Sequence, residues 1–164
     1  MTYRVPFGQL KIGLTAKMHL EDAITSNWIS EGKKTALFER LFAEKFQWKH
    51  AIACSSGTDA GIVVWSAVRE LAQAEWGHGY VFTPACAFAA TANCLLAAGV
   101  LPYFLDIELD TLNLNPQELN HLVNVGEDDI EAQLKMADRI ICGVQFVAQI
   151  GKPTPVPDIA LLPN

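Results

Sequence analysis

The 164-residue chain has few charged residues, and this shortage argues against several classes of function. Only 18% of its residues are charged, whereas about a quarter are charged in ordinary soluble proteins. The formal net charge is −6, and the 12 lysines and arginines form no basic cluster. Because nucleic-acid-binding surfaces need clustered positive charge, the sequence predicts no nucleic-acid partner.

Long apolar runs are also missing, although 51% of the residues are hydrophobic and the mean hydropathy is +0.19. No run reaches the roughly 20 consecutive apolar residues of a membrane span. The first six residues contain no apolar segment of the kind found in secretory signals. We therefore expect a cytoplasmic protein without membrane contact, whose short apolar runs form a sheet buried on both faces.

Metal-binding patterns are absent as well. The four cysteines are Cys54, Cys86, Cys94 and Cys142. No two of them form a CxxC pair, so we expect buried free thiols in a reducing compartment rather than a zinc site. The acidic run at 127–131 lacks the alternating ligands and central glycine of a calcium loop. We interpret it as a solvated segment and predict no metal.

Hydrophobic periodicity divides the chain into two parts. An arm and two helices occupy 1–49, and alternating strands and helices occupy 50–164. The expected helices are 15–27, 35–46, 58–76, 87–98 and 116–122, and the expected strands are 50–54, 80–83, 100–106 and 139–146. This alternation is typical of an α/β fold, a mostly parallel sheet with helices on both faces. A phenylalanine stripe in 35–46 is interpreted as core packing. Gly99 is expected to end the helix 87–98, and Asn115 is expected to cap the helix 116–122.

The segment 50–59 connects a predicted strand to a predicted helix through small residues. Ser55, Ser56 and Gly57 precede the helix, and Thr58 begins it. The first N–H groups of a helix have no partner inside the helix, and the helix dipole favours an anion there. The three hydroxyl groups add donors. The turn is either a phosphate site or an ordinary helix start with Ser56 or Thr58 as N-cap.

A second loop, 84–93, follows the next predicted strand. Ligands of parallel sheets bind beyond the carboxyl ends of the strands, so this loop and the 55–58 turn are expected to share a pocket. Phe88 is a single large aromatic residue among small ones. Its ring would either stack on a flat heteroaromatic ligand or belong to the core.

Five blocks of residues carry a family resemblance. They are Gly32 with Phe38-Glu39 and Phe42; Ser55 to Ala60; Pro84 with Phe88 to Asn93; Gly99 with Pro102 and Asp106; and Asp110 to Leu114 with Pro116. In this order and spacing they resemble the amino-terminal part of the DegT/DnrJ/EryC1/StrS family. These are sugar aminotransferases that depend on pyridoxal 5′-phosphate (PLP) and have the aspartate-aminotransferase fold. One short Ser-Gly-Thr motif would be a weak match, whereas five ordered blocks are far more specific.

The resemblance implies a role for particular residues. Gly57 and Thr58 would hold the phosphate of PLP, and Phe88 would stack on its pyridine ring. Trp28 and Gly32 would lie near the entrance for a nucleotide-linked sugar. The implied reaction moves an amino group, typically from glutamate, to a keto sugar on a nucleotide carrier. The resemblance also implies a homodimer.

The chain departs from the family pattern near its end. The family's aspartate for the pyridine nitrogen and its cofactor lysine follow the region that Gly151 matches, and neither motif occurs before Asn164. We therefore assign no catalytic residue, interpret 50–164 as an incomplete PLP-binding domain of a truncated chain, and expect no transamination by this polypeptide alone. Two alternatives remain: a deoxysugar dehydratase in which histidine replaces the lysine, and a non-catalytic α/β domain that binds a phosphate ligand or a protein partner.

Overall fold

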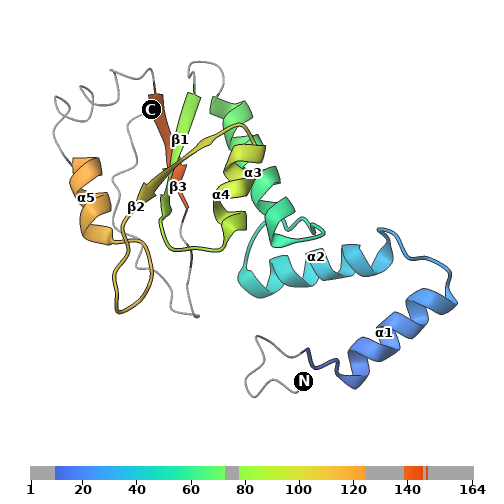
Figure 1. Ribbon diagram of the computed structural model, residues 1–164. Helices are drawn as coiled ribbons and strands as arrows, with labels where there is room; N and C mark the ends of the chain where they lie inside the picture. The colour runs from blue at the N-terminus through green and yellow to red at the C-terminus, as the bar shows by residue number, and fades with distance from the viewer. Residues whose placement is uncertain (1–9, 73–77, 125–138, 146, 148–164) are drawn as a thin grey trace. The chain divides into compact units, whose positions relative to one another are not determined.

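The computed structural model describes residues 10–72, 78–124, 139–145 and 147 (Figure 1). The chain divides into two compact units, Met1–Ala53 and Cys54–Asn164. We describe each unit by itself. The acidic run at 127–131 and the chain end after 147 lie outside the described residues.

The described part of the first unit, residues 10–53, contains two helices and no buried helical residue. Helix α1 spans Leu14–Thr25 and α2 spans Lys33–Phe46. A 2.6 Å ion pair joins Lys34 Nζ to Asp22 Oδ2 between the two helices. Both predicted helices are therefore present, within two residues of their expected bounds.

The aromatic stripe of α2 does not form a core. Phe38 is 55% exposed and Phe46 is 49% exposed. The rings contact one another instead, with 4.6 Å between the centroids of Phe42 and Phe46 and 5.8 Å between those of Phe42 and Trp48. Within the first unit these rings therefore pack on one another and on Trp48 rather than into a core, contrary to the prediction.

The strand expected at 50–54 is also wrong. Residues 51–54 have no strand conformation, and no strand of the sheet that the described residues form includes them. A strand needs a neighbouring strand to pair its backbone groups. Here the N–H group of Ala53 donates to Glu39 Oε1 at 2.8 Å, so a side chain of α2 takes the place of a ladder partner.

The second unit has the predicted α/β architecture. Its elements are α3 (Gly57–Ala72), β1 (His78–Pro84), α4 (Ala89–Ala97), β2 (Leu101–Leu105), α5 (Pro116–Asn124) and β3 (Arg139–Val144). β1 lies between β2 and β3 and pairs with both in parallel. The mostly parallel sheet is therefore confirmed.

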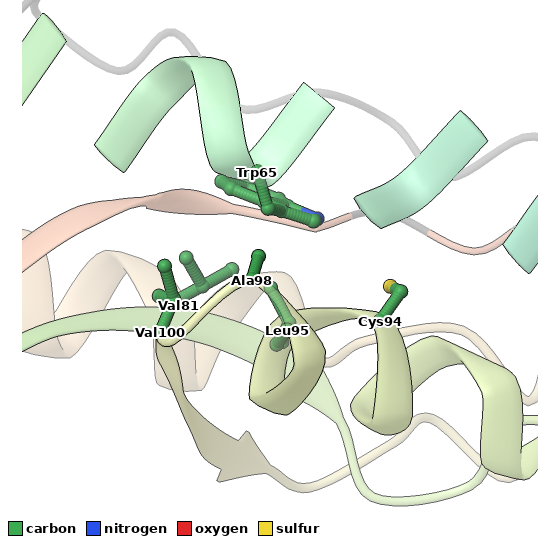
Figure 2. Packing of buried hydrophobic residues seen from close by; sticks show 6 residues of the cluster. All are labelled: Trp65, Val81, Cys94, Leu95, Ala98 and Val100. Atoms are coloured by element: carbon green, nitrogen blue, oxygen red, sulfur yellow. The ribbon is translucent and has the colours of Figure 1, made fainter. Parts of the chain in front are cut away.

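Successive residues of β1 face opposite sides of the sheet. Val81 packs with α3 and α4 in a cluster that contains Trp65 and Leu95 (Figure 2). Phe82 packs with Leu119 of α5 in a second cluster. Helices thus cover both faces, as predicted, and α3 and α4 share one of them (Figure 1).

Local signals fix the ends of two helices. Gly99 has φ +76°, and the N–H groups of Gly99 and Val100 donate to Leu96 O and Leu95 O at 3.0 and 2.9 Å. This pair of bonds is the Schellman motif, which confirms Gly99 as the stop of α4. Asn115 Oδ1 accepts the N–H of Gln117 at 2.9 Å, so α5 has the expected asparagine cap.

Among the described helices, none is long and apolar enough to cross a membrane. The described residues also contain no group of three His, Cys, Asp or Glu side chains able to hold a metal ion. Among the described residues, Cys54, Cys86 and Cys94 form no disulfide; the first two are exposed and Cys94 is buried. The expectation that these thiols are all buried is wrong, because Cys54 and Cys86 lie in segments outside the helices and strands.

Candidate functional site

The side chains around the first turn of α3 form hydrogen bonds with one another and with the backbone of that turn. The N–H group of Asp59 donates to Ser56 Oγ at 3.1 Å, and Ser56 Oγ donates to Asp59 Oδ2 at 3.0 Å. Ser55 Oγ donates to the same carboxylate oxygen. Ser56 is therefore the N-cap, one of the two candidates that the sequence suggested.

These bonds change the electrostatics of the turn. The hydroxyl of Ser55, followed by that of Ser56, lowers the pKa of Asp59 below its ordinary value of 3.8. Both serine hydroxyls thus donate to a carboxylate of the same turn, and the sequence had suggested them as donors to a ligand. The backbone N–H groups at the start of α3 and the hydroxyl of Thr58 remain as candidate donors to an anion.

Phe88 is the N-cap residue of α4, with φ −64° and ψ 140°. Its side chain is 79% exposed, so it is not a core residue. The structure thereby removes the core interpretation of Phe88 and leaves its ring free to contact a ligand.

A cavity of about 300 Å³ brings the predicted cofactor residues together. Its walls come from the first turns of α3 and α4 and from the residue that follows β3. The lining residues are Gly57, Thr58, Gly61, Phe88, Ala90, Thr91, Cys94 and Gln145. Three of these, Gly57, Thr58 and Phe88, are the residues that the sequence assigned to one cofactor.

Two glycines of α3 shape this cavity in different ways. A Cβ atom on Gly61 would lie 2.8 Å from Cys94 Sγ, so glycine at this position lets α3 and α4 approach closely. A Cβ atom on Gly57 would have no described heavy atom within 4 Å. The protein itself therefore requires glycine at 61, whereas the space beside Gly57 is open.

Gln145 lines the cavity but was not among the predicted site residues. Its backbone N–H donates to Phe82 O at 2.8 Å, which holds it at the carboxyl end of β3 beside β1. A polar residue at the end of an apolar strand was the available signal. The predicted strand extended to residue 146, so Gln145 was placed inside the strand rather than just beyond its end.

Trp28 and Gly32 belong to the first unit, and their predicted role is not tested by the cavity. Trp28 Nε1 donates to Glu31 O at 2.8 Å. A Cβ atom on Gly32 would lie 2.5 Å from the same indole nitrogen. The folding of this loop on itself therefore accounts for the glycine without a ligand.

Comparison with known proteins places the chain in a class of aminotransferases. A family model described as the DegT/DnrJ/EryC1/StrS aminotransferase family matches residues 11–131. The chain belongs to this family.

Individual relatives agree with this assignment. The chain is 32% identical over 120 residues to the spore coat polysaccharide biosynthesis protein SpsC of Bacillus subtilis, covering 73% of this chain and 29% of SpsC. A DegT/DnrJ/EryC1/StrS aminotransferase structure from Brucella abortus has 26% identity and a TM-score of 0.60, covering 78% of this chain and 31% of that one.

A third protein shows the fold alone. The GDP-4-keto-6-deoxy-D-mannose-3-dehydratase of E. coli, solved with bound hydrated PLP, has 21% identity and a TM-score of 0.65. The match covers 83% of this chain and 39% of the dehydratase chain. The present chain thus spans less than half the length of each of these three relatives.

Proposed function

We propose that the cavity between α3 and α4 binds PLP and is part of the active site of a sugar aminotransferase. The observation that carries this proposal is that Gly57, Thr58 and Phe88 line one cavity. Family membership supports the same assignment. The likeness to the dehydratase concerns the fold and does not favour dehydration over amino transfer.

The lining residues fit the separate parts of this cofactor. The first N–H groups of a helix and its positive dipole end attract a phosphate dianion. An exposed aromatic ring offers a flat apolar surface to a pyridine ring. A volume of about 300 Å³ lies at the lower end of the range typical of small-molecule sites.

These residues bind and orient, and PLP, when bound, supplies the electron sink for amino-group transfer. Thr58 and the first turn of α3 would hold the phosphate and so fix the position of the ring. Phe88 would cover one face of the ring and exclude water from it. Within this proposal the acceptor is a keto sugar on a nucleotide carrier and the amino donor is glutamate.

Three further features belong to the proposal. Trp28 and Gly32 would lie near the sugar-nucleotide entrance, the enzyme would be a homodimer, and it would work in the cytoplasm. Each rests on family membership.

The test uses 4′-deoxypyridoxine 5′-phosphate, which keeps the ring and phosphate of PLP but has no aldehyde to react with lysines. Calorimetry on the 164-residue chain compares it with the same ring without phosphate. We expect the phosphate to strengthen binding by at least about tenfold, since hydrogen bonds to charged groups contribute roughly 1.5–3 kcal/mol. Equal affinity for the two molecules would contradict the proposal.

Matched variants locate the binding. Phe88→Leu is expected to weaken binding by about twofold to tenfold, because ring stacking contributes about 0.5–1.5 kcal/mol beyond area burial. Phe104→Leu changes a half-exposed phenylalanine that does not line the cavity, and should leave binding unchanged. Thr58→Val, compared with Thr25→Val in α1, tests the phosphate end in the same way.

A further inference from the structure

The first unit contains a second cavity, of about 380 Å³, between one face of α2 and the segment that follows this helix. All of its lining residues belong to this unit, and none of them lines the cavity between α3 and α4. The segment is tied to α2 at both ends. The N–H of Trp48 donates to Ala43 O at 2.9 Å, and the N–H of Ala53 donates to Glu39 Oε1 at 2.8 Å. These two bonds hold the segment along the helix, so the walls of the cavity are in place before any ligand binds.

Trp48 forms one wall of this cavity. Its ring centroid lies 5.8 Å from that of Phe42 and 5.7 Å from that of Phe46. Neither phenylalanine lines the cavity, so the indole packs against them with one part of its surface and faces the cavity with another. Trp48 remains 60% exposed. An aromatic ring that is held by its neighbours but not covered offers a flat apolar surface to another ring.

The charged residues of the lining differ in whether they already have partners. Arg40 Nη1 is paired with Glu44 Oε1 at 3.0 Å, and Glu39 accepts the backbone bond described above. Lys49 and His50 have no hydrogen-bond or ion-pair partner among the described residues. The formal charges of the lining cancel, with two carboxylates against one guanidinium and one ammonium. The unpaired ammonium of Lys49 is therefore the group available to attract an anionic ligand.

We infer that this cavity binds a small aromatic carboxylate, whose ring stacks on Trp48 and whose anionic group pairs with Lys49. A doubly charged phosphate would meet the two carboxylates of the lining with only one unpaired cation to offset them, so a singly charged group fits better. His50 lines the same cavity and can add a hydrogen bond, because an imidazole carries an N–H donor. A volume of about 380 Å³ lies within the range typical of small-molecule sites.

The test compares two probes of the same shape, naphthalene-2-carboxylate and the neutral naphthalene-2-carboxamide. Calorimetry on the 164-residue chain gives their dissociation constants. We expect the carboxylate to bind about fivefold more tightly, the scale of one solvent-exposed ion pair. Added salt should reduce this preference, because it screens exposed charges. In NMR spectra the indole N–H signal of Trp48, identified by its absence in Trp48→Leu, should shift with both probes.

Two variants with matched controls locate the binding. Lys49→Met should bring the ratio of the two dissociation constants close to one, whereas Lys33→Met removes a lysine of α2 outside the cavity and should not change it. Trp48→Leu should weaken both probes by about twofold to tenfold, the scale of ring stacking. Phe38→Leu changes an exposed aromatic residue of α2 that does not line the cavity, and should leave both affinities unchanged. Thermal unfolding of each variant shows whether the fold is retained.

Equal affinities for the two probes, or a preference that persists in Lys49→Met, would overturn the inference. Binding that is lost in Phe88→Leu and kept in Trp48→Leu would also overturn it, because the probes would then occupy the cavity between α3 and α4. Absence of binding would overturn it as well, while the proposed function, which is tested with a different ligand, would stand.

Discussion

The two units of the chain use their apolar residues in opposite ways. In Met1–Ala53 both helices form, yet neither α1 nor α2 has a buried residue. In Cys54–Asn164 two clusters of buried residues lie on the two faces of a parallel sheet. The difference teaches that an amphipathic pattern predicts a helix but not its burial, which needs a second surface to pack against.

The same difference separates the two groups of predicted site residues. Thr58 and Phe88 stand on helices whose other faces are anchored by buried side chains, and the cavity depends on that anchoring. Trp28 and Gly32 stand in a loop held by its own hydrogen bond. Residues placed by a core can be assigned to a ligand from geometry, whereas residues in a self-contained loop cannot.

Removing matched leucines from the two units should give the largest difference. Leu119 is fully buried between α5 and the sheet, whereas Leu41 on α2 is 50% exposed. We expect Leu119→Ala to lower the free energy of unfolding by about 2–5 kcal/mol, because it leaves a cavity. Leu41→Ala should cost less than about 1 kcal/mol. Urea unfolding followed by circular dichroism measures both, and equal losses would contradict the comparison.

Sequence alone anticipated the second unit better than the first. The alternation of strands and helices, the glycine stop at Gly99 and the asparagine cap at Asn115 follow from local chemistry, and all are present. The strand at 50–54 failed because an apolar run does not specify its pairing partner.

Among the residues that line the cavity, sequence reasoning singled out only those that stand beside turns. Gly57, Thr58 and Phe88 were singled out because each lies near the start of a helix that follows a short connection. Gln145 was missed because its contribution depends on the pairing of β3 with β1 and on a contact with Cys94, 51 residues away along the chain. Such long-range contacts leave no periodic signal in the sequence.

Two glycines sharpen the comparison within the second unit. Gly61→Ala would force a methyl group against Cys94 and should lower the free energy of unfolding by about 1–3 kcal/mol. Gly57→Ala meets open space and should leave stability nearly unchanged.

At Gly57 we expect the substitution to change ligand affinity rather than stability, because the added methyl group would occupy space beside the ligand phosphate. We expect Gly57→Ala to weaken binding of 4′-deoxypyridoxine 5′-phosphate by about tenfold, a cost of about 1.4 kcal/mol that lies within the range for overpacking. Thermal unfolding and calorimetry on the same samples measure the two effects. Unchanged affinity would show that Gly57 does not face the ligand.

The smallest expected effects concern two exposed carboxylates, one in each unit. The hydrogen bond and then the charge of Lys34 lower the pKa of Asp22, whereas the neutral hydroxyls of Ser55 and Ser56 lower that of Asp59. In both cases the folded state has the lower pKa, so each stabilising contribution is present above the ordinary value of 3.8 and is lost as the pH falls through the folded pKa.

Salt should separate the two carboxylates, because it screens charges but leaves bonds to neutral hydroxyls nearly unaffected. We expect high ionic strength to raise the pKa of Asp22 toward its ordinary value and to change that of Asp59 much less. Carboxyl resonances followed by NMR during pH titration measure both values in one sample. Lys34→Met should remove most of the salt dependence of the Asp22 pKa and leave the smaller part that comes from the charge of His19. An equal response of Asp59 to salt would mean that charge rather than the serine hydroxyls controls its titration.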